Sequence, residues 1–186
     1  KITFQELAGK AVAVDAYNSL HQFLAIIRGP TGEPLMDRRG RVTSHLSGLL
    51  YRTSNLAELG AKLVYVFDGK PPVEKGIEIK RRMRVREEAV LKYEEALSRG
   101  DLAAARTYAQ ATVVLKDHIV EDAKRLLTLM GVPWVQAPSE GEAQAAYMAA
   151  RGDVWAVGSQ DHDALLFGAP HLIRNLTMSG RRKLPG

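Results

Sequence analysis

The chain has 186 residues, 46% of them hydrophobic, and a formal net charge of +5. This length suffices for one well-buried domain and is too short for two large ones. It contains no cysteine, which excludes disulfides, zinc–thiolate sites and thiol nucleophiles. No apolar stretch approaches the length of a membrane span and no signal peptide is visible, so we expect a soluble intracellular protein without membrane contacts.

The first part of the chain, residues 1–72, alternates the patterns of strands and helices. Apolar runs predict buried strands at Ala11–Val14 and Leu63–Phe67, and helical spacing of apolar residues predicts helices at Asn18–Ile27 and Ser44–Leu59. This alternation is typical of a parallel α/β sheet.

The middle part, residues 73–112, is rich in charge. Five of the seven residues from Lys80 to Arg86 are basic. Helical spacing places Lys75, Arg82 and Arg86 on one stripe. Such a run usually forms a solvated helix face, but here it follows directly on a strand that ends in an acid, so these helices would rise beside that acid.

The last part, residues 113–186, returns to the α/β pattern. Its predicted elements are a helix at Ile119–Met130, an edge strand at Val132–Val135, a helix at Glu140–Ala150, a strand at Val154–Gly158 and a further strand at His171–Arg174. We therefore predict an α/β fold with a mostly parallel central sheet flanked by helices and with a helical arch insertion. The three parts would form a single domain over residues 1–186.

Six acids stand where this fold would gather them. They are Asp15, Asp68, Glu140, Glu142, Asp161 and Asp163. Ligands of parallel sheets bind outside the carboxyl ends of the strands, and a patch of oxygen ligands this acidic suits Mg²⁺ or Mn²⁺. Two such ions roughly 3.5–4 Å apart would account for so many carboxylates. A metal centre inside a basic protein predicts a phosphodiester substrate.

Each acid also has a purely structural interpretation. Ser139 and Glu142 fit a capping box, which for Glu142 alone is the more common role. Asp68-Gly69 fits a turn, and Asp163 fits the cap of a helix that begins at Ala164. The arrival of all six acids at one end of a sheet favours the metal interpretation.

Four sequence blocks resemble the signature blocks of flap endonucleases of the structure-specific 5′-nuclease superfamily. They are Val14-Asp15-Ala16-Tyr17-Asn18, Phe67-Asp68-Gly69-Lys70-Pro71-Pro72, Ala137-Pro138-Ser139-Glu140-Gly141-Glu142-Ala143 and Ser159-Gln160-Asp161-His162-Asp163. Their order and spacing agree with the family, and the segment from Asn175 to Pro185 is more similar to archaeal members than to eukaryotic ones.

The resemblance implies a Mg²⁺-dependent endonuclease and 5′–3′ exonuclease that binds two ions, for which Mn²⁺ substitutes, and removes 5′ flaps from branched DNA in replication and repair. The six acids match the family's metal ligands, and Lys75 and Arg82 match its pair at the scissile phosphate. The implied DNA contacts are Arg28, Thr43, Arg52, Lys70, Arg86 and His21, the last at a position where the family usually carries a stacking aromatic residue.

The resemblance also implies segments that we expect this chain to lack. These are the family's N-terminal start and its C-terminal part, which includes a further metal-binding aspartate and a tail that binds the sliding clamp. We therefore expect the chain alone to cleave DNA weakly. Its expected location is the cytoplasm if it is archaeal and the nucleus if it is eukaryotic.

Two other functions stay open at this point. A PIN-type metal-dependent ribonuclease shares strand-end acids, although the basic insertion and the Glu140/Glu142 pair argue against it. A non-catalytic nucleic-acid-binding fragment would gain nothing from a negative cluster. An aspartyl-phosphate phosphatase is excluded because Asp15-Ala16-Tyr17 lacks the Asp-x-Asp pattern.

Overall fold

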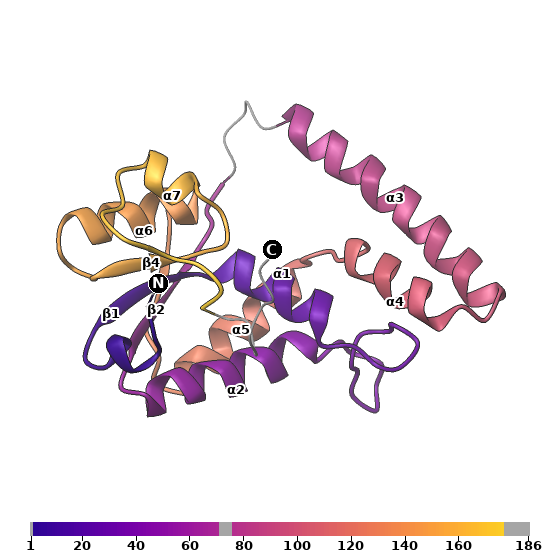
Figure 1. Ribbon diagram of the computed structural model, residues 1–186, viewed down its shortest axis with the longest axis horizontal. Helices are drawn as coiled ribbons and strands as arrows, with labels where there is room; N and C mark the ends of the chain where they lie inside the picture. The colour runs from indigo at the N-terminus through magenta and orange to yellow at the C-terminus, as the bar shows by residue number, and fades with distance from the viewer. Residues whose placement is uncertain (1, 71–75, 177–186) are drawn as a thin grey trace.

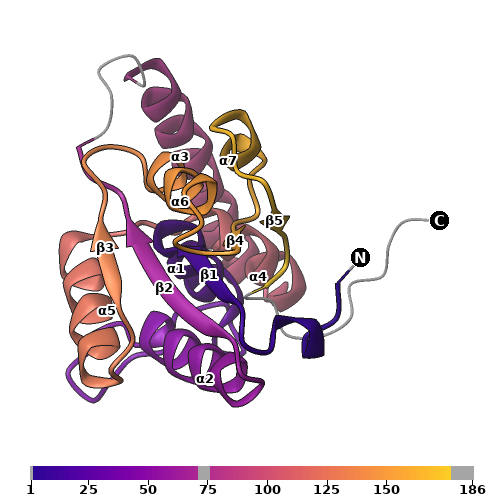
Figure 2. The same cartoon turned by 90° about the vertical axis from the view of Figure 1, so that its left-hand side faces the viewer.

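The computed structural model describes residues 2–70 and 76–176, with the backbone alone for residues 76–80 and 82. A short 3₁₀ helix, η1 (Gln5–Leu7), precedes five strands. These strands are β1 (Ala11–Asp15), β2 (Lys62–Phe67), β3 (Trp134–Gln136), β4 (Ala156–Gly158) and β5 (Leu172–Ile173). They form one sheet in the order β3-β2-β1-β4-β5, and every neighbouring pair is parallel (Figure 2).

The helices cover the sheet in two layers and add a hairpin. They are α1 (Ala16–Ile26), α2 (Ser44–Glu58), α3 (Gly76–Ser98), α4 (Leu102–Ala111), α5 (Asp117–Leu129), α6 (Gly141–Ala150) and α7 (Asp163–Leu166). Helices α1, α2 and α5 lie on one face of the sheet, and α6 and α7 lie on the other (Figures 1 and 2). The predicted α/β class with a mostly parallel sheet and a helical insertion is confirmed.

The alternation of side chains along β1 and β2 builds both layers. Val12, Val14, Tyr65 and Phe67 enter the larger core with the side chains of α1, α2 and α5. The intervening residues, such as Ala13, face a smaller core formed largely by alanines of α6. Small side chains let α6 approach the sheet closely, which brings its N-terminus to the strand ends.

Helices α3 and α4 form the insertion predicted between residues 73 and 112. They pack as a hairpin that extends away from the sheet (Figure 1). Among the described side chains of the two helices, the buried ones are alanines: Ala89, Ala96, Ala105 and Ala109. At the base of the hairpin, Arg106 Nη2 donates to the Gly29 carbonyl over 3.5 Å.

Several predicted boundaries shift by one to three residues. The first helix begins at Ala16, earlier than predicted, because Asp15 caps it. The strand predicted from Val154 begins at Ala156, where pairing with Val12 of β1 starts, although the Trp155 N–H already donates to the Ala11 carbonyl. No helix among the described residues is long and apolar enough to span a bilayer.

Candidate metal centre

The carboxyl ends of β1, β2 and β4 deliver the acids to one place. Asp15 is the last residue of β1, and its Oδ1 accepts the Asn18 N–H over 2.9 Å as the N-cap of α1. Asp68 follows β2 directly, and Asp161 lies three residues after β4. Because these strands are parallel neighbours, their ends share one edge of the sheet.

Three acids form the tightest group. Glu142, Asp161 and Asp163 each place one carboxylate oxygen within 4.8 Å of the others. Glu142 comes from the first turn of α6, and Asp163 begins α7. An all-oxygen donor set of this charge fits a hard divalent cation such as Mg²⁺ or Mn²⁺.

Ser159 connects this group to Asp15. Its hydroxyl lies 2.7 Å from Glu142 Oε1 and 3.2 Å from Asp15 Oδ2, and it accepts the Asp161 N–H over 3.2 Å. A hydroxyl has one proton, so the two carboxylates share a single donor. Sequence reasoning did not assign Ser159 a role, although its position directly after a predicted strand was a usable signal.

Asp68 is held by the start of α6. Its Oδ1 accepts the Gly141 N–H over 2.7 Å. A Cβ atom at Gly141 would lie 2.7 Å from that oxygen and 3.3 Å from the Val66 carbonyl oxygen. Position 141 therefore needs glycine for this close approach of helix and strand end.

The structural interpretations of Glu142 and Asp163 are wrong in detail. The N-cap of α6 is Glu140 rather than Ser139, and the side chain of Glu140 makes no capping bond. Glu142 accepts from Ser159 instead of the Ser139 amide. Asp163 is the first residue of α7, and His162 precedes it as the N-cap. The predicted capping box does not form because Ser159, directly after β4, is the hydrogen-bond partner of Glu142.

The electrostatics of the cluster favour a bound cation. Burial raises the pKa of Asp15 to about 7, against the opposing effect of the Asn18 N–H and with support from the charges of Glu142 and Asp68. Burial also raises the pKa of Glu142, to which the negative charges of Asp161, Asp163 and Asp68 add. Five acids thus repel one another, and a cation among them relieves that repulsion.

Glu140, the sixth acid, lies beside these five. It is half-buried at the N-cap of α6, two residues before Glu142. It is outside the group that shares oxygens within 4.8 Å. Its assignment as a metal ligand stays a prediction.

Two of the predicted DNA contacts bind backbone carbonyls of their own protein. Arg28 donates to the carbonyls of Leu24 (2.8 Å) and Gly32 (2.6 Å), and Arg52 donates twice to the Leu176 carbonyl (2.8 and 2.5 Å). Both guanidinium groups therefore hold loops in place, a role that sequence reasoning missed. Each side chain remains partly exposed.

The remaining predicted contacts have simpler surroundings. Thr43 precedes α2 and makes no side-chain cap bond, His21 is exposed on α1, Lys70 is exposed after β2, and Arg86 is partly exposed on α3. Lys75 and the side chain of Arg82 lie outside the described residues. The DNA roles of all these residues stay predictions.

An open hollow of about 480 Å³ adjoins the acids on the α5 side. Asp68 and Lys70 line it from the β2 end, and Tyr17, Glu121 and Lys124 line it from the helices. Burial and the charges of Asp68, Asp117 and Glu121 raise the pKa of Tyr17. Asp68, the member of the acid cluster that lines the hollow, is thus accessible from solvent along this side.

Comparisons with known proteins identify the family of this chain. The XPG N-terminal domain matches residues 1–89, and the XPG I-region matches residues 131–185. Flap endonuclease 1 of Hyperthermus butylicus is 65% identical over 185 residues, which cover 100% of this chain and 53% of the relative. The chain belongs to the flap endonuclease family. It spans about half the length of the curated relatives it matches.

Solved structures place this flap endonuclease chain among the same folds. Flap endonuclease-1 from Methanococcus jannaschii superimposes with a TM-score of 0.73 at 49% identity, over 97% of this chain and 57% of that one. The catalytic core of Rad2 in complex with a DNA substrate superimposes with a TM-score of 0.66 at 25% identity, over 97% of this chain and 48% of that one. A DNA complex is therefore known for a related fold.

Proposed function

We propose that this protein is a structure-specific 5′-flap endonuclease that hydrolyses DNA phosphodiester bonds near junctions of single and double strand. The observation that carries the proposal is the meeting of Asp15, Asp68, Glu142, Asp161 and Asp163 at the carboxyl ends of parallel strands. The DNA substrate follows from the family and from the DNA complex of Rad2.

The proposed cofactor is a pair of Mg²⁺ ions, for which Mn²⁺ substitutes. When bound, such ions stabilise charge on a reacting phosphate and activate water. Glu142, Asp161 and Asp163 would provide the first set of oxygens, and Asp15, Asp68 and Glu140 the others. Asp15 would release a proton when a cation arrives, because its pKa near 7 belongs to the cation-free protein.

The other residues of the centre orient these ligands. The Ser159 hydroxyl fixes Glu142 and Asp15 against each other, and the Gly141 N–H fixes one oxygen of Asp68. Outer partners of this kind typically change metal affinity or activity 10- to 100-fold when they are removed.

The basic residues would act on the substrate. Lys75 directly precedes α3 in the chain and Arg82 lies in its second turn, and we propose that they bind the scissile phosphate and stabilise its developing charge. The DNA contacts of Arg28, Thr43, Arg52, Lys70, Arg86 and His21 complete the proposed interface. Residues 1–72, 73–112 and 113–186 would act together as one nuclease domain.

The proposal extends to the biological setting. We propose a role in DNA replication and repair, with 5′–3′ exonuclease activity beside the endonuclease activity. The archaeal relatives favour a cytoplasmic protein. Association with a sliding clamp, through a C-terminal tail of the kind implied by the family resemblance, is the proposed partner interaction.

A substrate comparison tests the function. The protein, expressed from its complete reading frame, is incubated with 5′-labelled flap DNA, blunt duplex and a matched RNA, with Mg²⁺ or with EDTA. We expect Mg²⁺-dependent cutting of the flap near the junction and little cutting of the other two. Preferential RNA cleavage would establish a ribonuclease instead, and cutting in EDTA would contradict the metal centre.

A further inference from the structure

Asp68 directly follows β2, and the neighbouring edge strand β3 supports the backbone at this point. Strand pairing of β2 with β3 reaches Phe67 and Gln136, and the Ala137 N–H donates to the Phe67 carbonyl over 2.8 Å. Beyond this pair the regular register ends, because the Gly69 N–H donates to the Ser139 carbonyl where a continued ladder would use the Ala137 carbonyl. The Asp68 carbonyl therefore lies at the point where the regular ladder stops.

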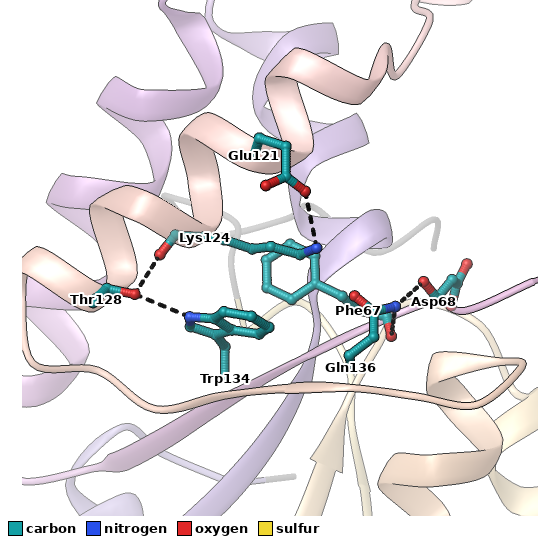
Figure 3. Close-up of polar contacts among 7 residues, drawn as sticks. All are labelled: Phe67, Asp68, Glu121, Lys124, Thr128, Trp134 and Gln136. Atoms are coloured by element: carbon teal, nitrogen blue, oxygen red, sulfur yellow. Dashed lines mark hydrogen bonds and ion pairs between the residues drawn. The ribbon is translucent and has the colours of Figure 1, made fainter.

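The side chain of Gln136 supplies a donor in that stretch. Its Nε2 lies 2.5 Å from the Asp68 carbonyl oxygen and 3.4 Å from the Phe67 carbonyl oxygen. Figure 3 shows the amide of Gln136 pointing at the backbone of both residues. One amide group therefore spans the last residue of the strand and the first residue after it.

Asp68 is consequently held at three points. Its carbonyl accepts from Gln136, its carboxylate accepts from Gly141, and the next residue, Gly69, donates to the Ser139 carbonyl over 2.5 Å. Gly69 also has no room for a side chain, since a Cβ atom there would lie 2.3 Å from the Ala137 carbonyl oxygen. Fixing the peptide planes on both sides of Asp68 sets the direction of its Cα–Cβ bond.

We infer that Gln136 is a positioning residue of the metal centre, which acts on the bound cation through Asp68. The inference rests on the proposed function, because it gives Asp68 the role of a metal ligand. The amide of Gln136 does not reach the acid cluster itself. Its effect passes through the backbone of Asp68, whose charge is close enough to raise the pKa values of both Asp15 and Glu142.

The same strand offers a matched control. Trp134 Nε1 donates to Thr128 Oγ1 over 3.1 Å, so Trp134 also ties β3 to a neighbour through one side-chain bond (Figure 3). Trp134→Phe removes that bond and keeps a ring beside Phe67 and Lys124. A purely structural role for the side chains of β3 would give Trp134→Phe and Gln136→Met similar effects.

Calorimetric titration with Mn²⁺ in the absence of DNA is the primary test. We expect Gln136→Met, which keeps the length of the side chain and removes the donor, to weaken Mn²⁺ binding about tenfold. Thermal unfolding in EDTA should change little, because Gln136 is exposed at the edge of the sheet. Trp134→Phe should bind Mn²⁺ as the unsubstituted protein does.

Flap cleavage provides the second readout. In Gln136→Met, kcat should fall at limiting Mg²⁺ and recover as Mg²⁺ is raised, while KM for the flap DNA stays within about twofold. Unchanged Mn²⁺ affinity in Gln136→Met, or an equal loss in Trp134→Phe, would overturn the inference. A protein that binds Mn²⁺ but cuts no flap DNA would contradict the proposed function, and the calorimetric comparison would still decide the role of Gln136.

Discussion

The sheet edge with its acids and the α3–α4 hairpin are built on opposite principles. At the sheet edge, large side chains such as Tyr65 and Phe67 fill a continuous core, and that rigid packing forces repelling carboxylates together. In the hairpin, two helices meet along small residues such as Ala96 and Ala105, and most other described side chains face solvent. In the first region carboxylates repel one another, whereas in the second charged side chains are exposed to solvent.

This contrast separates two ways in which a substitution acts. A change at the sheet edge should alter cation binding with little cost in stability, because the core beneath it remains intact. A change in the hairpin should alter local stability and DNA handling and leave cation binding unchanged. Three experiments test this division, and a fourth concerns a buried histidine of α2.

The largest effect is expected at Asp161. Asp161→Asn removes a carboxylate from the group with Glu142 and Asp163, so Mg²⁺-dependent flap cleavage should fall at least about a hundredfold. In EDTA the melting temperature should rise, since one repelling charge has left the cluster. Asp101→Asn is the matched control in the hairpin, where asparagine also serves as the N-cap of α4. Equal losses in both variants would refute the assignment of Asp161.

The next effect is a pH dependence of folding at His45. This buried side chain has no hydrogen-bond partner for either ring nitrogen among the described residues, and burial lowers its pKa from 6.5 to about 4. The unfolded chain therefore takes up a proton below pH 6.5 that the folded protein refuses until about pH 4. As the pH falls from 6.5 to about 4, the free energy of unfolding should decrease by up to about 3 kcal/mol.

Urea unfolding at several pH values checks this expectation. His45→Leu should remove that part of the pH dependence. Asp15 has the opposite effect on stability in EDTA, because its pKa is raised in the folded protein. The folded protein is stabilised by protonated Asp15 below about pH 4, and this stabilisation is lost as the pH rises to about 7. The two contributions are separated by comparing His45→Leu with Asp15→Asn. If the stability of His45→Leu depends on pH as that of the unsubstituted protein does, His45 does not titrate as inferred.

Substituting one glycine in each region should separate an effect on cation binding from an effect on stability. Gly141→Ala places a methyl group 2.7 Å from Asp68 Oδ1, so Mn²⁺ affinity should fall about tenfold. Stability should change little, because the roughly 0.5–1 kcal/mol that alanine gains over glycine in a helix offsets the cost of moving Asp68. Gly100→Ala in the hairpin has open space but a φ of +71°, so it should lose about 1 kcal/mol and keep its Mn²⁺ affinity. Calorimetry and urea unfolding measure both quantities.

The smallest effect is expected within the hairpin seam. Ala105→Leu overfills a fully buried position of α4 and should destabilise the hairpin by about 1 kcal/mol or more. Hydrogen exchange should speed up for amides of α3 and α4 and stay unchanged for those of β1 and β2. Faster exchange in the sheet would show that the two regions unfold as one unit.

Much of this organisation was predictable from local patterns. The strands that end in Asp15 and Asp68 are short apolar runs with no helical alternative of the same length. The basic insertion was equally clear, since its helices are long and are interrupted at Gly100. The family's motifs then identified the acids as a set, and the structure places five of them within electrostatic reach of one another.

Local patterns failed where a side chain had a choice of partners. Glu142 fitted a capping box, but Ser159 from another strand end is its partner. Arg28 and Arg52 fitted DNA contacts, yet each also holds a backbone carbonyl of its own protein. A sequence pattern cannot rank a local partner against one that is 17 or 124 residues away.

By itself, the sequence determined which residues carry charge, which runs become strands, and that several strands end in acids. These properties depend on residue type and on spacing within a few positions. Only the tertiary structure decided that Gln136 meets the backbone of Asp68, that Gly141 must lack a side chain, and that one serine serves two carboxylates. Those contacts depend on strand order and on how closely α6 approaches the sheet, both of which are set by packing of the whole core.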